Sequence, residues 1–103
     1  MDIFKKLQDI KKRPGMYLGR DSLDLLKAYM DGWISAHQEL NCNLDLSFFS
    51  DFQTYIQDYY KVLSDQNWAN IIKFYSVDDR EALDLFYVHL EKFINIRESN
   101  RPI

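Results

Sequence analysis

Apolar residues recur three and four positions apart along most of this chain, which is the spacing of one face of an amphipathic helix. Asp2 is placed to cap the first of these apolar stripes. The pattern predicts helices over residues 1–12, 21–40, 50–63, 67–76 and 77–96. We therefore expect an all-α fold: a single-domain compact bundle of about five helices over residues 1–103.

Side chains that cap helices precede two of these segments. Either Asp21 or Ser22 stands where the second helix begins. Ser50, followed by Gln53, has the spacing of a capping box, which predicts that the third helix begins at Ser50. The two phenylalanines at 48–49 are then expected in the preceding loop.

Residues 11–20, KKRPGMYLGR, combine four cationic side chains with a proline and two of the three glycines. A phosphate-binding P-loop needs more widely spaced glycines followed by Lys and then Ser or Thr, whereas Gly15 and Gly19 are followed by Arg-Asp. A type II turn centred on Pro14-Gly15 explains the segment better, and it returns residues 16–18 to the core. The basic side chains then form a solvated helix face, with contact to phosphate as the alternative.

Composition limits the class of protein. Hydrophobic residues make up 47% and aromatic residues 16% of the chain, which is too apolar for a disordered protein. No apolar run approaches the ~20 residues that span a bilayer, and the charged N-terminus lacks the apolar core of a secretory signal. Cys42 is the only cysteine, so a disulfide framework is excluded. We expect a cytoplasmic protein with no membrane partner.

The net charge of −3 hides a strong asymmetry along the chain. Residues 1–20 carry six basic and two acidic side chains, a charge of +4. Residues 21–103 carry seven basic and fourteen acidic side chains, a charge of −7. An acidic body repels nucleic acid and attracts cationic proteins, so we expect a basic protein partner and no direct nucleic-acid binding.

The chemically reactive side chains form no catalytic pattern. His37 and His89 lack partners at metal-ligand spacing, and Cys42 has no activating neighbour in the sequence. We therefore expect no enzyme activity, no metal and no cofactor. Two groups of carboxylates, with two tyrosines as candidate anchors, are instead the predicted partner-binding residues. These residues are Asp45, Asp51, Tyr55, Asp58, Tyr59, Asp78, Asp79, Glu81 and Asp84.

Residues 12–19, KRPGMYLG, closely resemble the start of the ATPase domain of the DNA gyrase B subunit family. The likeness continues into LLKAYMDGWISA and then fails. The family's metal-binding Glu is replaced by Asp31-Gly32, and its later D-x-G-x-G loop is missing because no glycine follows Gly32. This resemblance implies a shared turn and helix at most.

A second resemblance covers most of the chain. The segments RPGMYLG, DG, WANII and ALDLF, in that order, resemble small bacterial immunity proteins of contact-dependent growth inhibition and related polymorphic toxin systems. The resemblance implies a cytoplasmic protein that binds and neutralises a cognate toxin, and it identifies no catalytic residues. We expect the toxin to be a nuclease whose active site or RNA-binding groove is covered. The alternatives are a nucleotide-binding or ATPase-like fragment and a general protein-interaction module.

Overall fold

The computed structural model describes residues 2–40 and 43–99, and within these ranges it contains helices and no strand. The helices are α1 (Ile3–Lys12), α2 (Pro14–Leu18), α3 (Leu23–Glu39), α4 (Phe48–Tyr60), α5 (Trp68–Phe74) and α6 (Asp79–Ser99). The predicted all-α bundle is confirmed, with the short α2 added to the five expected helices. In the part of the chain described, no helix is both long and apolar enough to cross a bilayer.

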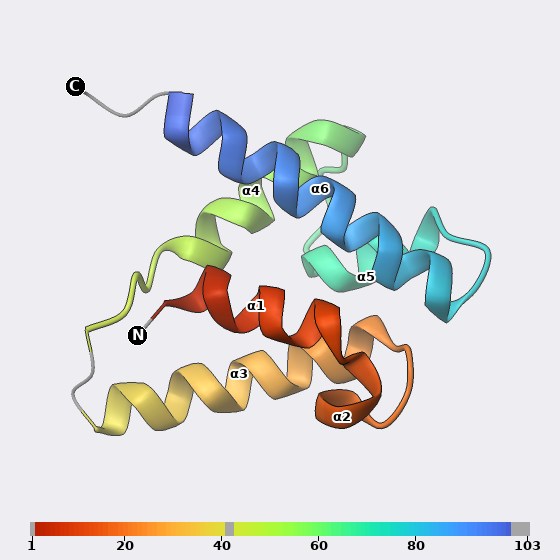
Figure 1. The fold of residues 1–103 in the computed structure, drawn as a ribbon. Helices are drawn as coiled ribbons and strands as arrows, with labels where there is room; N and C mark the ends of the chain where they lie inside the picture. The colour runs from red at the N-terminus through yellow and green to blue at the C-terminus, as the bar shows by residue number, and fades with distance from the viewer. Residues whose placement is uncertain (1, 41–42, 100–103) are drawn as a thin grey trace.

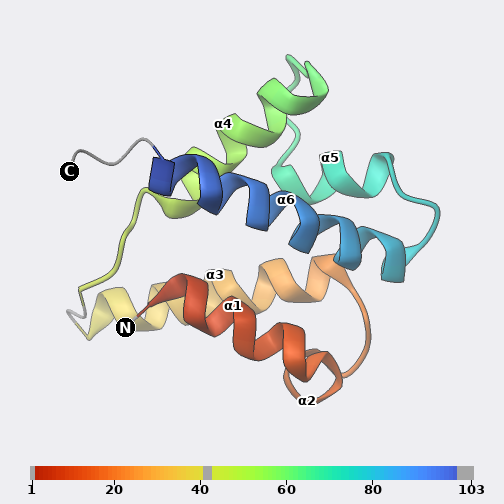
Figure 2. The ribbon, with the colours of Figure 1, turned by 45° about the horizontal axis from the view of Figure 1, so that its top comes forward.

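The helices form two layers. The antiparallel helices α1 and α3 lie side by side in one layer, and α4, α5 and α6 form the other (Figure 1, Figure 2). The long helix α6 packs against α3, α4 and α5, and α3 also contacts α5. The two layers therefore meet along α6 and the start of α3.

Aromatic and aliphatic side chains fill the space between the layers. The largest fully buried apolar side chains are Leu7, Ile10, Leu23, Leu26, Met30, Phe52, Ile56, Ile72, Phe86 and Leu90. A buried polar bond joins the two layers: the hydroxyl of Tyr87 donates to the backbone oxygen of Leu7 at 2.7 Å. Burial raises the pKa of the Tyr87 hydroxyl, which keeps it protonated as a donor.

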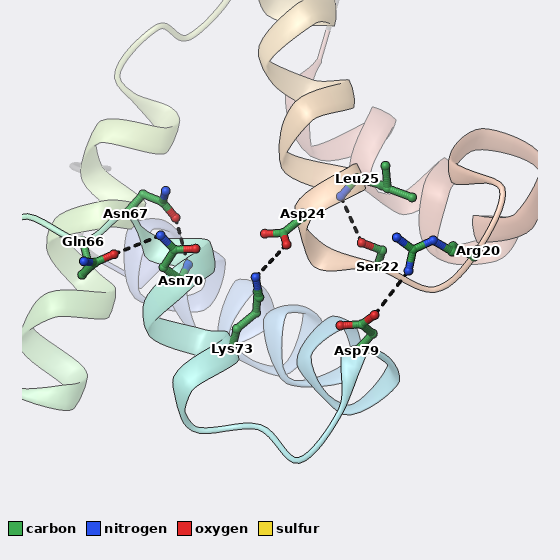
Figure 3. A network of polar contacts seen from close by, with 9 residues as sticks. All are labelled: Arg20, Ser22, Asp24, Leu25, Gln66, Asn67, Asn70, Lys73 and Asp79. Atoms are coloured by element: carbon green, nitrogen blue, oxygen red, sulfur yellow. Dashed lines mark hydrogen bonds and ion pairs between the residues drawn. The ribbon is translucent and has the colours of Figure 1, made fainter.

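Two of the predicted helix starts are confirmed. The Asp2 carboxylate accepts from the backbone N–H of Phe4 at 2.9 Å, and the Ser22 hydroxyl oxygen accepts from that of Leu25 at 3.2 Å (Figure 3). Both side chains satisfy donors in a first helical turn that have no partner within the helix.

The predicted start of the third helix at Ser50 is wrong. Helix α4 begins at Phe48, whose buried ring packs edge-on against Phe93 of α6, with 5.6 Å between ring centroids. Gln53 does not cap the helix. Its side-chain oxygen accepts from the backbone N–H of Trp68 at 2.6 Å instead. Packing against α6 therefore extends the helix beyond its local capping signal.

The predicted type II turn at Pro14-Gly15 is also wrong. Pro14 occupies the first position of α2, where its fixed φ suits a helix and its missing N–H is not needed. The left-handed residue is Gly19, with φ of 82°, which ends α2. Met16 is 64% exposed, so of residues 16–18 only the last two pack against the core.

Replacing Gly19 by alanine is expected to lower the free energy of unfolding by about 1 kcal/mol, because a Cβ disfavours positive φ. Gly15→Ala is the matched control: Gly15 lies inside α2, and an added Cβ would meet no atom within 4 Å. It should therefore leave stability unchanged or raise it slightly. Urea unfolding followed by circular dichroism measures both. Equal effects of the two substitutions would contradict the assignment of Gly19 as the strained position.

Candidate protein-binding surface

An aromatic cluster joins α4 to α6 and to the chain after α5. Tyr59 and Tyr60 end α4, Tyr75 follows α5, and His89 lies in the middle of α6. The rings of Tyr60 and Tyr75 stack with 4.3 Å between centroids, and the Tyr59 ring lies 4.5 Å from that of His89. Tyr55, one turn earlier on α4, packs against Tyr59. The two predicted anchor tyrosines, Tyr55 and Tyr59, therefore belong to one cluster.

His89 is the polar centre of this cluster. It is only 1% exposed, and its Nε2 lies 2.6 Å from the Tyr60 hydroxyl oxygen. Its Nδ1 is buried and has no hydrogen-bond partner. Burial, followed by the positive charge of Lys92, lowers the pKa of the His89 imidazole. A protonated ring carries an N–H on both nitrogens, and the N–H on Nδ1 would then be buried without an acceptor. The geometry therefore favours neutral His89.

Beside this cluster, α5 and the loop after α4 enclose a hollow of about 370 Å³, the α4–α5 hollow. Tyr75 of the cluster forms part of its wall. The rest of the lining is also uncharged and consists of Val62, Ser64, Gln66, Asn70, Ile71 and Phe74. The hollow therefore presents apolar side chains together with hydroxyl and amide groups.

Large apolar side chains stand uncovered at this hollow. Leu63, which lies between two lining residues, is 101% exposed, and Phe74 is 81% exposed. Tyr75 is also exposed, although its ring stacks on Tyr60. We call Leu63, Phe74 and Tyr75 the apolar patch. A patch of this kind on a small protein is typical of a binding site for another protein.

Asp45 and Asp51 of the first predicted acidic group lie beside the C-terminal part of α6. The Arg97 guanidinium is 2.9 Å from Asp45 and 3.6 Å from Asp51. The Ser47 hydroxyl, which donates to Asp45 at 2.6 Å, and Arg97 together hold the pKa of the Asp45 carboxyl below its usual value. Much of the negative charge of Asp45 and Asp51 is therefore balanced within the protein.

The second predicted acidic group lies at the start of α6. Asp78 accepts from the backbone N–H of Glu81 at 2.8 Å, and the Glu81 side chain accepts from the N–H of Val77 at 3.0 Å. Asp79 pairs with Arg20 at 3.3 Å across to the α2–α3 connection (Figure 3). These carboxylates therefore stabilise the helix start and its attachment to the other layer.

The two acidic groups do not converge on one site. Asp79 and Arg97 are eighteen residues apart on α6, or about 27 Å at 1.5 Å per residue. Asp58 and Asp84 are exposed, and no ion pair among the described residues uses either of them. Asp84 lines a second hollow, of about 280 Å³. Lys11 and Arg80 line the same hollow.

Much of the basic N-terminal segment has a place within the fold. The Lys6 ammonium lies over the rings of Tyr17 and Trp33, at 5.2 and 5.9 Å from their centroids. The Lys11 ammonium lies 5.5 Å from the centroid of the Tyr87 ring. These contacts help to join α1 to its neighbours and support the structural interpretation of the segment.

No group of three or more His, Cys, Asp or Glu side chains with metal-site geometry occurs in residues 2–40 and 43–99. The side chain of His37 lies on α3, where its Nδ1 is 2.8 Å from the backbone oxygen of Trp33. Cys42 lies outside the described residues.

Comparison with protein-family models, with curated proteins and with solved structures finds no match for this chain.

Proposed function

We propose that this protein is an immunity protein: it binds a cognate bacterial toxin and neutralises it by covering the active site or RNA-binding groove of a basic nuclease domain. The observation that carries the proposal is the uncovered apolar patch of Leu63, Phe74 and Tyr75 on a chain whose body is strongly acidic. Apolar anchors inside a polar and charged surround are the usual composition of a protein-binding surface.

Charge supports a cationic partner. A nuclease presents Lys and Arg to the phosphates of its substrate, and an inhibitor with the opposite charge is steered towards those residues. Asp58, which directly precedes Tyr59 of the aromatic cluster, is exposed and joins none of the ion pairs among the described residues. The resemblance of the RPGMYLG, WANII and ALDLF segments to immunity proteins points to the same function.

The proposal predicts that the gene directly upstream encodes a toxin C-terminal domain, and that domain is the partner to test. Co-expression should restore growth to bacteria that are killed by the toxin domain alone, and the two proteins should purify as an equimolar complex. Because charge steers the encounter, the association rate should fall as salt rises from about 0.05 M to about 0.5 M. Unchanged toxicity, together with no complex when both proteins are present at about 10⁻⁵ M, would reject the proposal.

A further inference from the structure

The wall of the α4–α5 hollow is fastened by two glutamines on successive turns of α4. The Gln57 amide donates to the backbone oxygen of Ser64 at 3.1 Å. The Gln53 amide donates to the backbone oxygen of Gln66 at 2.9 Å, and its side-chain oxygen accepts from Trp68 N–H. These three bonds hold the loop between α4 and α5 against α4. The hollow is therefore preformed, which reduces the entropy lost when a ligand binds there.

The chain leaves α4 in a way that exposes Leu63. Lys61 adopts a left-handed conformation with φ of 56°, and the Val62 N–H donates to the backbone oxygen of Gln57 at 3.0 Å. This bend ends α4 before Leu63, so Val62 enters the hollow lining while Leu63 stays fully exposed. Across the hollow, Asn70 donates to the side-chain oxygen of Gln66 at 3.0 Å, so α5 and the loop are joined directly (Figure 3).

Two exposed carboxylates lie close to the hollow's lining residues in the sequence. Asp65 is exposed and lies between Ser64 and Gln66, which both line the hollow, and Asp58 lies on the last turn of α4. Lys73 of α5 is held by Asp24 at 2.6 Å (Figure 3), so its charge is balanced within the protein. Lys61 is the nearest cation in the sequence to Asp58 and Asp65. Together with the charge of −7 over residues 21–103, the exposed Asp65 beside the hollow favours a positively charged partner.

We infer that the α4–α5 hollow is the docking site for one apolar side chain of the cationic toxin, presented between Lys or Arg residues that face Asp58 and Asp65. The apolar floor accepts the side chain, and the amides of Gln66 and Asn70 face the polar groups around it. Phe74, which lines the hollow, and Leu63, which lies between the lining residues Val62 and Ser64 in the sequence, stay exposed and are available to the same partner. This inference rests on the proposed function and assigns it a particular surface.

Phe74→Ala and Leu63→Ala test the inference with the purified toxin domain. Each should raise the Kd by about 30-fold or more, the cost typical of a buried interface anchor, and the rise should come mainly from faster dissociation. Met16→Ala is the matched control, because Met16 is a similarly exposed apolar side chain on α2. It should leave the Kd unchanged. All three variants should keep the wild-type melting temperature, because the altered side chains are exposed.

The outcomes separate the inference from the proposed function. If the wild-type protein binds and inhibits the toxin while Phe74→Ala and Leu63→Ala bind it equally well, the toxin-binding surface lies elsewhere and only the inference fails. If the wild-type protein does not bind the toxin, the function fails and the inference fails with it. Sedimentation of the isolated protein supplies a third result. A dimer that Phe74→Lys dissociates would show that a second copy occupies the hollow, which also overturns the inference.

Discussion

Replacing Phe52 by alanine is expected to lower the free energy of unfolding by about 3–5 kcal/mol, the range measured for large buried aromatic side chains. Phe52 lies on α4 and is completely buried. Its ring centroid is 5.4 Å from that of Trp68, 5.5 Å from Phe86 and 5.3 Å from Phe93. One side chain therefore joins α4 to α5 and α6, and its removal opens a cavity where the three helices meet.

Urea unfolding followed by circular dichroism measures this loss, and Phe74→Ala provides the matched control. Phe74 is the same residue type but is 81% exposed, so its truncation should change stability by no more than about 0.5 kcal/mol. Because domains of this size are stable by only about 5–15 kcal/mol, the Phe52 variant should be close to unfolding at moderate temperature. A loss below about 1 kcal/mol for Phe52→Ala would contradict the central position of this ring.

The sequence predicted most of the fold because its strongest signals are local. A period of three to four residues defines α1, α3 and α6, and the caps at Asp2 and Ser22 depend on side chains within three residues of the helix start. The error at the start of the third helix occurred where distant contacts decide the structure. Gln53 bonds Trp68, fifteen residues away, and Phe48 packs on Phe93, so the capping-box spacing around residue 50 was misleading.

The candidate surface was less predictable than the fold. The surplus of tyrosines indicated a binding surface, but periodicity cannot show that Tyr60 meets His89, twenty-nine residues later. Leu63 belongs by spacing to the apolar face of the predicted third helix, yet the left-handed bend at Lys61 ends that helix early and leaves Leu63 exposed. Phe74 is the last residue of α5, and its exposure depends on where that helix ends.

The same limit applies to the acidic residues. Their number is evident from the sequence, but their partners are not. Arg97 lies fifty-two residues from Asp45, and Arg20 lies fifty-nine residues from Asp79. Once these pairs form, Asp58, Asp65 and Asp84 are among the exposed carboxylates that join no ion pair within the described residues.

Replacing His89 by alanine is expected to lower the free energy of unfolding by about 2–4 kcal/mol near pH 7.5, because truncation opens a cavity and leaves the Tyr60 hydroxyl unpaired. The groups facing His89 are Tyr55, Tyr59 and Tyr60 from α4 and Lys92 from α6. Tyr60→Phe isolates the hydrogen bond and should cost about 1 kcal/mol.

Acid should destabilise the wild-type protein through the same residue. The pKa of His89 is lowered in the folded state from an unfolded value of about 6.5, so below pH 6.5 the unfolded chain binds the extra proton. Stability should therefore be complete above about pH 6.5 and fall as the pH drops below that value, by no more than about 1.4 kcal/mol per pH unit. The lowered pKa of Asp45 acts separately, since its contribution is lost only as the pH falls below 3.8.

Urea unfolding at three pH values should show the decline in the wild type and in His37→Gln, and should show it abolished in His89→Ala. A decline that persists in His89→Ala would assign the acid sensitivity to another group.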